Sequence, residues 1–126
     1  MHLNQVTVTV RNIPDAIDFY TRLGLEMIVK SDHYARFLCP EGGSTFSIHL
    51  GDALPSDATT IYFECDALDE HVRELEAGGL VFESQPLDQS WLWREAYLRD
   101  PSGNRLCLYH AGKNRLDPPW RLHKAG

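Results

Sequence analysis

The sequence predicts an α+β fold built from two tandem βαβββ modules. Residues 3–10 and 59–65 alternate apolar and polar side chains, with the two-residue period of a half-buried strand. Each is followed by a segment with apolar residues at helical spacing, and then by three short strand-like segments. The same element order therefore occurs twice, in modules 3–50 and 59–110, which indicates an internal duplication.

Composition and charge exclude several classes of protein. The 126 residues suffice for one domain, and 43% of them are hydrophobic, which is typical of a globular protein. No apolar stretch approaches the roughly 20 residues that cross a bilayer, and no signal segment opens the chain, so we expect no membrane association. The formal net charge of −6, without a Lys/Arg cluster, argues against nucleic-acid binding. A neutral or cationic small ligand fits this charge better.

The cysteines indicate a reducing environment. Cys39, Cys65 and Cys107 form an odd set that lacks CxxC or zinc-finger spacing. We therefore expect free thiols and a cytoplasmic location.

The first module begins with a strand whose valines, Val6, Val8 and Val10, share one face. A helix follows, with Asn12 as its N-cap and Gly24 after its last apolar residue. The next three segments have the composition of strands, and a Pro-Glu-Gly-Gly turn separates the second from the third. They span residues 25–30, 34–39 and 44–50.

The second module repeats this order after a linker at 51–58. We expect Asp66 to cap its helix, which ends before Gly78-Gly79. The solvated face of this helix is expected to carry Glu70, Arg73, Glu74 and Glu76. Three further strands are expected at residues 80–84, 93–99 and 104–110, and the segment 111–126 is expected to be an extended tail.

Two sequence signals identify a family. The first module holds Phe19-Tyr20 followed by Leu23-Gly24-Leu25, and the second holds the turn Asp100-Pro101-Ser102-Gly103-Asn104 before its last strand. In combination, these signals resemble the vicinal oxygen chelate superfamily, which includes glyoxalase I, extradiol dioxygenases, fosfomycin-resistance enzymes and bleomycin-binding proteins. The resemblance covers residues 3–110, which we expect to form a single domain.

The resemblance implies that the two modules form curved sheets facing one another around a cavity, with the helices outside. Alternation along the strands then gives each sheet a core face and a cavity face. The core faces are expected to carry Val6, Val8, Val10, Phe46, Ile48, Ile61, Phe63, Leu98, Leu106 and Leu108. The cavity faces are expected to carry Gln5, Thr7, Thr9, Ser47, His49, Thr60, Tyr62, Glu64, Glu95, Tyr97, Cys107 and Tyr109.

The family's metal enzymes use four cavity positions, which fall here on Gln5, His49, Thr60 and Cys107. Thr60 replaces the usual His, and Cys107 replaces the usual Glu. Divalent ions that polarise vicinal oxygens prefer imidazole and carboxylate ligands, so this set is softer and weaker. The expected cofactor is either none or one divalent ion (Zn, Ni, Mn or Fe) held by Gln5, His49 and Cys107.

Three cavity residues, His49, Glu95 and Tyr97, are candidates for catalysis. His49 paired with the carboxylate of Glu64 or Glu95 would form a general base. Tyr97 lies three residues before Asp100, where the resemblance to extradiol dioxygenases implies an acid–base residue. The alternative is that His49 is a hydrogen-bonded structural histidine and Tyr97 an aromatic wall of the site.

A larger group is expected to bind the ligand. Trp91 and Trp93 lie before or at the start of a strand and could clamp a planar ligand or anchor a dimer interface. The other predicted ligand-binding residues are Gln5, Thr7, Thr60, Tyr62, Glu64 and Tyr109. The resemblance implies a homodimer, and Pro118-Pro119-Trp120 of the tail is a candidate interface element.

Three functions are compatible with these residues. One is metal-free binding of a small oxygenated or aromatic ligand, as in the bleomycin-resistance members, with a degraded metal site. The second is a metal-dependent lyase or dioxygenase that uses Gln5, His49 and Cys107. The third is a metal-independent lyase or isomerase that uses His49 with Tyr97 or a Glu. The missing carboxylate at position 107 favours the first and the third.

Overall fold

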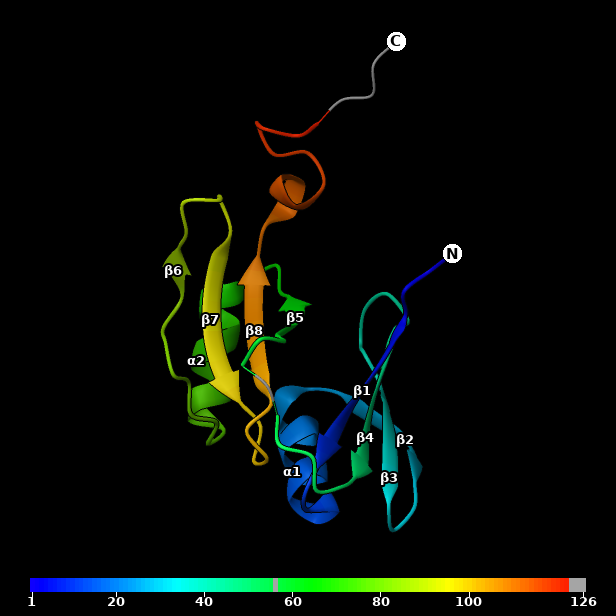
Figure 1. Cartoon of the computed structure of the whole chain (residues 1–126). Helices are drawn as coiled ribbons and strands as arrows, with labels where there is room; N and C mark the ends of the chain where they lie inside the picture. Colours follow the sequence, from blue (N-terminus) through cyan, green and yellow to red (C-terminus); the bar gives the residue numbers. More distant parts are fainter. Residues whose placement is uncertain (56, 123–126) are drawn as a thin grey trace.

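Two four-stranded sheets and two helices form the body of the protein in a computed structural model that describes residues 1–55 and 57–122 (Figure 1). The first module comprises β1 (Gln5–Val10), α1 (Ile13–Leu23), β2 (Glu26–Lys30), β3 (Tyr34–Leu38) and β4 (Thr45–Leu50). The second comprises β5 (Ile61–Glu64), α2 (Leu68–Ala77), β6 (Leu87–Asp88), β7 (Arg94–Arg99) and β8 (Arg105–His110). A 3₁₀ helix, η1 (Gly112–Arg115), follows. The predicted α+β class and the two βαβββ modules are confirmed.

The two sheets have the same topology. The strand order is β1-β4-β3-β2 in the first sheet and β5-β8-β7-β6 in the second. In each sheet the first strand pairs in parallel with the last, and the remaining pairs are antiparallel. Val6 lies opposite Phe46 in the first sheet, just as Ile61 lies opposite Leu106 in the second. This shared register matches β1 and β4 of the first module with β5 and β8 of the second, residue by residue along the paired strands.

One hydrophobic core joins the modules. α1 packs on the first sheet and α2 on β8 of the second. The ring of Tyr20 lies 4.7 Å from that of Phe46, which lies 5.9 Å from that of Phe63 in the other module. The residues predicted for the core faces are all buried in this core or packed against it, as alternation requires.

A buried carboxylate ties α1 to the second module. Asp100, which is only 4% exposed, accepts hydrogen bonds from the Tyr20 hydroxyl (2.7 Å) and the Asn104 side-chain amide (2.8 Å). Backbone N–H groups of Ser102 (3.0 Å) and Asn104 (2.8 Å) also donate to it. The Asn104 amide donates in addition to the carbonyl of Thr9 on β1 (2.9 Å). The two sequence signals of the family therefore meet in one hydrogen-bond network, called here the Asp100 junction.

Two local predictions are wrong. Asp66 does not cap α2, because the chain stays non-helical through Ala67, whose side chain cannot cap the helix. Residues 80–84 do not form a strand. Only Phe82 makes a bridge, to Leu98, and the paired segment of this region is β6, a few residues later.

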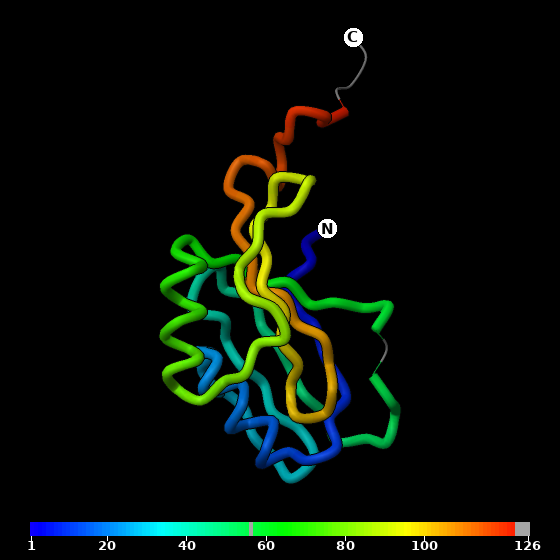
Figure 2. The backbone as a smooth tube through the Cα atoms, turned by 90° about the vertical axis from the view of Figure 1, so that its left-hand side faces the viewer, coloured from blue at the N-terminus to red at the C-terminus, as the bar shows by residue number. Residues whose placement is uncertain are grey.

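The linker and the tail lie at the surface. Residues 51–55 and 57–58 form an irregular loop that extends from one side of the body (Figure 2). The tail is not wholly extended, because it begins with η1 before running away from the body (Figure 1). Leu116 and Trp120 of the tail are exposed, and residues 123–126 lie outside the described part. No helix within the described residues is long and apolar enough to cross a membrane.

We predict that Tyr20→Phe lowers the free energy of unfolding by about 1–3 kcal/mol at neutral pH, because Asp100 loses a buried hydrogen-bond donor. Urea unfolding followed by circular dichroism measures this change.

The stability of the wild-type protein should also depend on pH through Tyr20. Burial and the Asp100 carboxylate raise the pKa of Tyr20 well above its ordinary value near 10. The stabilisation linked to its proton is therefore complete below about pH 10 and is lost as the pH rises from there toward the folded-state pKa. Wild-type stability should fall more steeply in that range than that of Tyr20→Phe, and equal slopes would contradict this assignment.

Candidate functional site

The predicted site residues lie on one face of each sheet, called here the site faces. Cross-strand pairing places Thr9 beside His49 on the first sheet. On the second sheet, Cys107 lies between Tyr62 and Tyr97. These residues are neighbours because alternation turns every second side chain to the same side. The first site face thus holds Gln5, Thr7, Thr9, Ser47 and His49, and the second holds Thr60, Tyr62, Glu64, Glu95, Tyr97, Cys107 and Tyr109.

Hydrogen bonds within the sheet occupy the polar groups of the first site face. The Gln5 side-chain amide donates to the Ser47 hydroxyl (2.9 Å), and its carbonyl accepts from Thr45. The Ser47 hydroxyl also bonds the hydroxyl of Tyr34 (2.7 Å). His49 is exposed, and its Nε2 lies 2.9 Å from the Thr9 hydroxyl. The partner of His49 is therefore a hydroxyl, and the structure does not bring it to Glu64 or Glu95.

Aromatic rings dominate the second site face. Trp93 and Tyr109 stack with centroids 4.6 Å apart, and Tyr62 meets both edge-on at 5.9 and 5.6 Å. Offset-stacked and edge-to-face arrangements are the favoured geometries for aromatic pairs. Tyr62 is 45% exposed, so the cluster presents ring surface to solvent.

The second site face also holds a buried carboxylate, on the residue opposite Tyr109 in the sheet. Glu95 is only 2% exposed and accepts hydrogen bonds from the Trp91 indole N–H (3.0 Å) and the Tyr97 hydroxyl (2.7 Å). Burial and the hydrogen bond to Glu95 raise the pKa of Tyr97 far above its ordinary value, which keeps the phenol protonated. The guanidinium of Arg105 lies 4.4 Å from the centre of the Tyr97 ring. The protonated Tyr97 hydroxyl therefore acts as a hydrogen-bond donor to Glu95.

Two predicted site residues hold the start of the tail. Glu64 accepts hydrogen bonds from the backbone N–H groups of Ala111 (2.8 Å) and Gly112 (3.0 Å), and it lies 3.6 Å from the guanidinium of Arg115. The Trp93 indole N–H donates to the Asn114 carbonyl (3.3 Å). These contacts fix η1 against the second sheet, a role that sequence reasoning missed because it depends on where the tail returns.

The four positions that the resemblance assigns to a metal ion lie two on each sheet. Gln5 and His49 are on the first sheet, whereas Thr60 and Cys107 are on the second. The Thr60 hydroxyl accepts from Arg105 (3.2 Å), whose positive charge opposes a cation there. Burial, and secondarily Glu95, raise the pKa of the Cys107 thiol to about 12, which disfavours the thiolate that binds metals. The described residues contain no group of three His, Cys, Asp or Glu placed to hold an ion.

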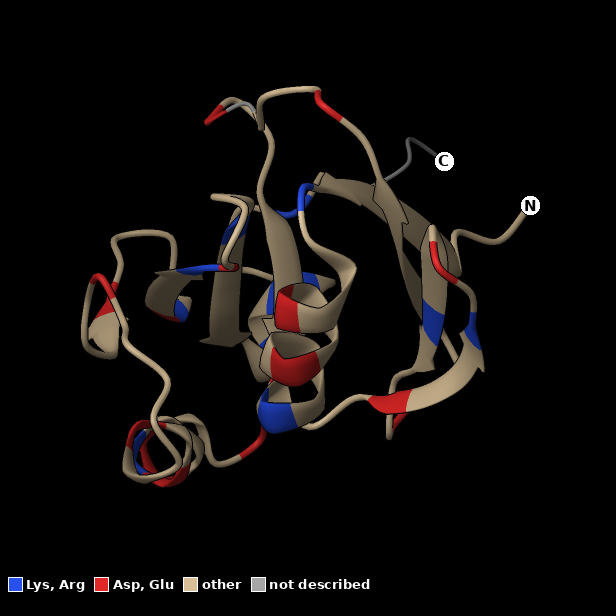
Figure 3. Cartoon of the chain, turned by 90° about the horizontal axis from the view of Figure 1, so that it is seen from below, with Lys and Arg blue, Asp and Glu red and all other residues tan. Residues whose placement is uncertain are grey.

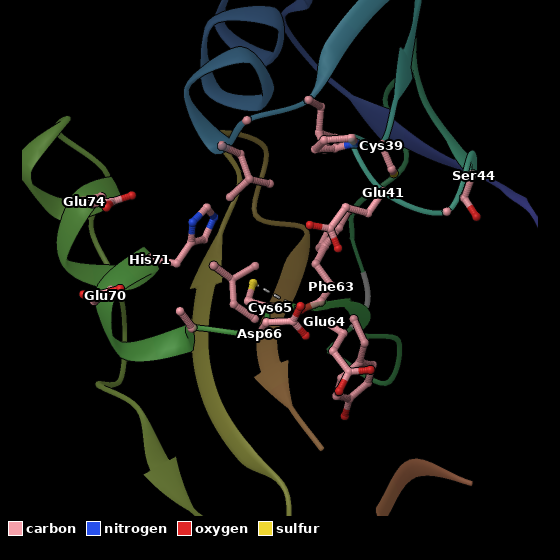
Figure 4. Close-up of a pocket in the computed structure, with 18 residues that line it drawn as sticks. Cys39, Glu41, Ser44, Phe63, Glu64, Cys65, Asp66, Glu70, His71 and Glu74 are labelled. Atoms are coloured by element: carbon pink, nitrogen blue, oxygen red, sulfur yellow. Dashed lines mark hydrogen bonds between the residues drawn. The ribbon is translucent and has the colours of Figure 1, made fainter. Parts of the chain in front are cut away.

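A cavity of about 700 Å³ lies between the modules, and of the predicted site residues only Tyr62 and Glu64 line it (Figure 4). It is bounded by α2, the end of α1, β5 and the loop between β3 and β4. Glu41 and His71, which line it, were not predicted as site residues. Glu70 and Glu74 are exposed, as helical periodicity predicted, and they line the cavity as well. Sequence patterning could not place the loop opposite this face, because the two are joined only by the packing of the modules.

Comparison with protein families identifies the family of this chain. The family model described as Glyoxalase/Bleomycin resistance protein/Dioxygenase superfamily matches residues 2–108. The chain therefore belongs to this superfamily, as its two sequence signals predicted. A comparison with curated proteins found no match.

Solved structures share the fold at low sequence identity. A glyoxalase/bleomycin resistance protein/dioxygenase from Nocardioides has a TM-score of 0.78 at 20% identity, covering 98% of this chain and 90% of its own. A lactoylglutathione lyase from Agrobacterium tumefaciens gives 0.71 at 19%, with 86% and 92% covered. A bleomycin-binding protein complexed with bleomycin gives 0.70 at 21%, with 87% and 98% covered. At these identities the similarity shows the fold alone.

We predict that Cys107 reacts much more slowly than Cys39 with iodoacetamide near pH 8. Cys107 is fully buried with a thiol pKa raised to about 12, whereas Cys39 is partly exposed. Peptide mapping by mass spectrometry after timed labelling measures both rates, and labelling in denaturant is the control for intrinsic reactivity. Rapid labelling of Cys107 in the folded protein would contradict the assigned environment.

Proposed function

We propose that this protein binds a small aromatic, oxygenated or cationic ligand on the second site face, without a metal ion. One observation carries the proposal: the rings of Tyr62, Trp93 and Tyr109 form one cluster, and the buried carboxylate of Glu95 belongs to the residue opposite Tyr109 in the same sheet. Apolar ring surface with a few fixed polar groups is the usual composition of a small-molecule site.

The geometry supports roles for individual residues. Tyr62 and Trp91, each 45% exposed, offer faces on which a planar ligand can stack. Glu95 accepts two hydrogen bonds from the protein, and a carboxylate has about four acceptor positions, so it retains capacity for a ligand N–H or O–H. The Tyr97 hydroxyl and the Trp91 indole hold Glu95 in place. The aromatic rings and the carboxylate that such binding needs are thus all present in the chain.

A homodimer is part of this proposal. The first site face carries exposed Gln5, Thr7 and His49, and a second copy of the chain could place it opposite the second site face. The exposed Leu116 and Trp120 of the tail are candidates for the contact between copies. The fold is shared with a bleomycin-binding protein, which motivates bleomycin as one test ligand. The free thiols support the expected cytoplasmic location.

We predict that aromatic ligands quench the tryptophan fluorescence of the protein in a saturable way. A panel of planar phenols, aromatic amines and bleomycin would be titrated into the wild-type protein and into Trp91→Phe and Tyr62→Ala. Each variant should weaken binding by about two- to tenfold, since an aromatic contact contributes roughly 0.5–1.5 kcal/mol. Val81→Ala, at an exposed position outside both site faces and the tail, is the control and should keep the wild-type affinity. Equal affinity in all variants would refute binding at this face.

A metal analysis separates this proposal from the metal-dependent alternative. After incubation with Zn, Ni, Mn or Fe(II) and dialysis, we predict far less than one bound ion per chain, because Gln5, His49, Thr60 and Cys107 include no carboxylate and burial raises the pKa of the Cys107 thiol to about 12. Elemental analysis of the wild type, His49→Ala and Cys107→Ser measures this. Stoichiometric metal that either variant loses would overturn the proposal in favour of a lyase or dioxygenase.

A further inference from the structure

The two modules are related by the internal duplication, but only one of their two equivalent junctions is closed. Because Ile61–Leu106 and Val6–Phe46 occupy equivalent registers, counting along the strands matches Asp100 with Pro40 and Asn104 with Ser44. By the same count, Tyr20 matches Leu75. The Asp100 junction therefore has a counterpart between the loop Cys39–Ser44 and the second module.

The counterpart cannot close in the same way. Pro40 has no carboxylate, Leu75 has no hydroxyl, and the short Ser44 side chain replaces the amide of Asn104. The cavity of about 700 Å³ occupies this position, and Pro40 and Ser44 are among its lining residues. Its volume lies within the range of about 300–1,000 Å³ that is typical of small-molecule sites. The fold thus leaves a space of ligand size at this junction, whereas side chains fill the equivalent Asp100 junction.

The cavity has an apolar floor and an acidic rim. Leu25, Phe63 and Leu108 contribute hydrocarbon surface from both modules. Five carboxylates line it: Glu41, Glu64, Asp66, Glu70 and Glu74. Among the described lining residues, none is Lys or Arg. Figure 4 shows Glu41 on the loop side and His71 on α2 directed into the space between these elements.

The negative charge of the rim is largely unneutralised. Glu64 is bound by η1 and Arg115, but no ion pair is recorded for the other four carboxylates in the described part of the chain. Lys and Arg elsewhere are dispersed over the fold (Figure 3). Burial, together with the charges of Glu41, Glu64 and Asp66, raises the pKa of the Cys65 thiol to about 11. Carboxylates from both modules therefore act on one point in the cavity.

We infer that this cavity is a second binding site, for an organic cation with an apolar body, such as an aromatic or alkyl amine. The ammonium group would lie among the rim carboxylates, and the hydrocarbon would cover the floor of Leu25, Phe63 and Leu108. The site adjoins the proposed ligand face, with which it shares Tyr62 and Glu64, and its other lining residues lie outside that face. The lining residues Glu41, Asp66 and Glu70 are exposed, so a ligand can reach the cavity from solvent.

Three ligands that share a phenyl ring but differ in charge test this inference. Isothermal titration calorimetry with the full chain would compare benzylammonium, benzyl alcohol and benzoate, which differ mainly in charge. We expect affinity in the order benzylammonium, benzyl alcohol, benzoate. Raising the salt concentration from about 0.02 M to about 0.5 M should weaken the binding of benzylammonium, because salt screens the rim charges. The binding of benzyl alcohol, which is uncharged, should not change. Equal affinity for the cation and the alcohol would overturn the inference.

Variants locate the binding. Glu41→Gln/Asp66→Asn removes one rim charge from each module and should weaken benzylammonium binding by up to about fivefold per carboxylate, with no loss for benzyl alcohol. Glu26→Gln/Asp32→Asn makes the same charge change at exposed positions outside the cavity and should retain wild-type affinity. In NMR spectra, benzylammonium should shift the amide signals of Gly42, Cys65 and Ala67. Equal losses in both double variants, or shifts confined to Trp91 and Trp93, would refute a site in this cavity.

Discussion

The carboxylate of Asp100 is the constraint on which the arrangement of the two modules depends. A buried carboxylate is costly unless hydrogen bonds satisfy it, and four donors converge on Asp100 from α1 and from its own turn. Three of these bonds form only when the turn has closed, and the fourth forms only when Tyr20 of the other module is in place. Asn104 then extends the network to β1. The junction therefore couples the local turn to the relative position of the two sheets.

Duplication gave the chain two similar junctions, and the residues at them have diverged. One junction is filled by hydrogen bonds and by the ring of Tyr20. The other has Pro40, Ser44 and Leu75 at the matching positions, which supply neither a buried acceptor nor donors to close it. A fold that is symmetric in its backbone is thus asymmetric in its cavities, and the open side has become acidic.

The same divergence separates the two site faces. On the first, short polar side chains such as Gln5 and Ser47 bond to one another and leave His49 beside a hydroxyl. On the second, Trp91 and Tyr97 donate hydrogen bonds to Glu95, and Arg105 donates to Thr60. A carboxylate held by neutral donors and aromatic rings is suited to recognising a ligand. Burial, and secondarily Glu95, raise the pKa of the Cys107 thiol on the same face to about 12, which disfavours its thiolate.

The sequence alone determined the element order, the core faces and the membership of site residues in two strand faces, because strand alternation and helix periodicity are local properties of the chain. It also identified Tyr20 and the Asp100 turn as signals, although not that they touch. Only the tertiary structure decided that Glu64 and Trp93 hold the tail, that β6 forms after residues 80–84, and that Glu41 faces α2 across a cavity. Those features depend on contacts between segments far apart in the chain, and no local periodicity records which segments will meet.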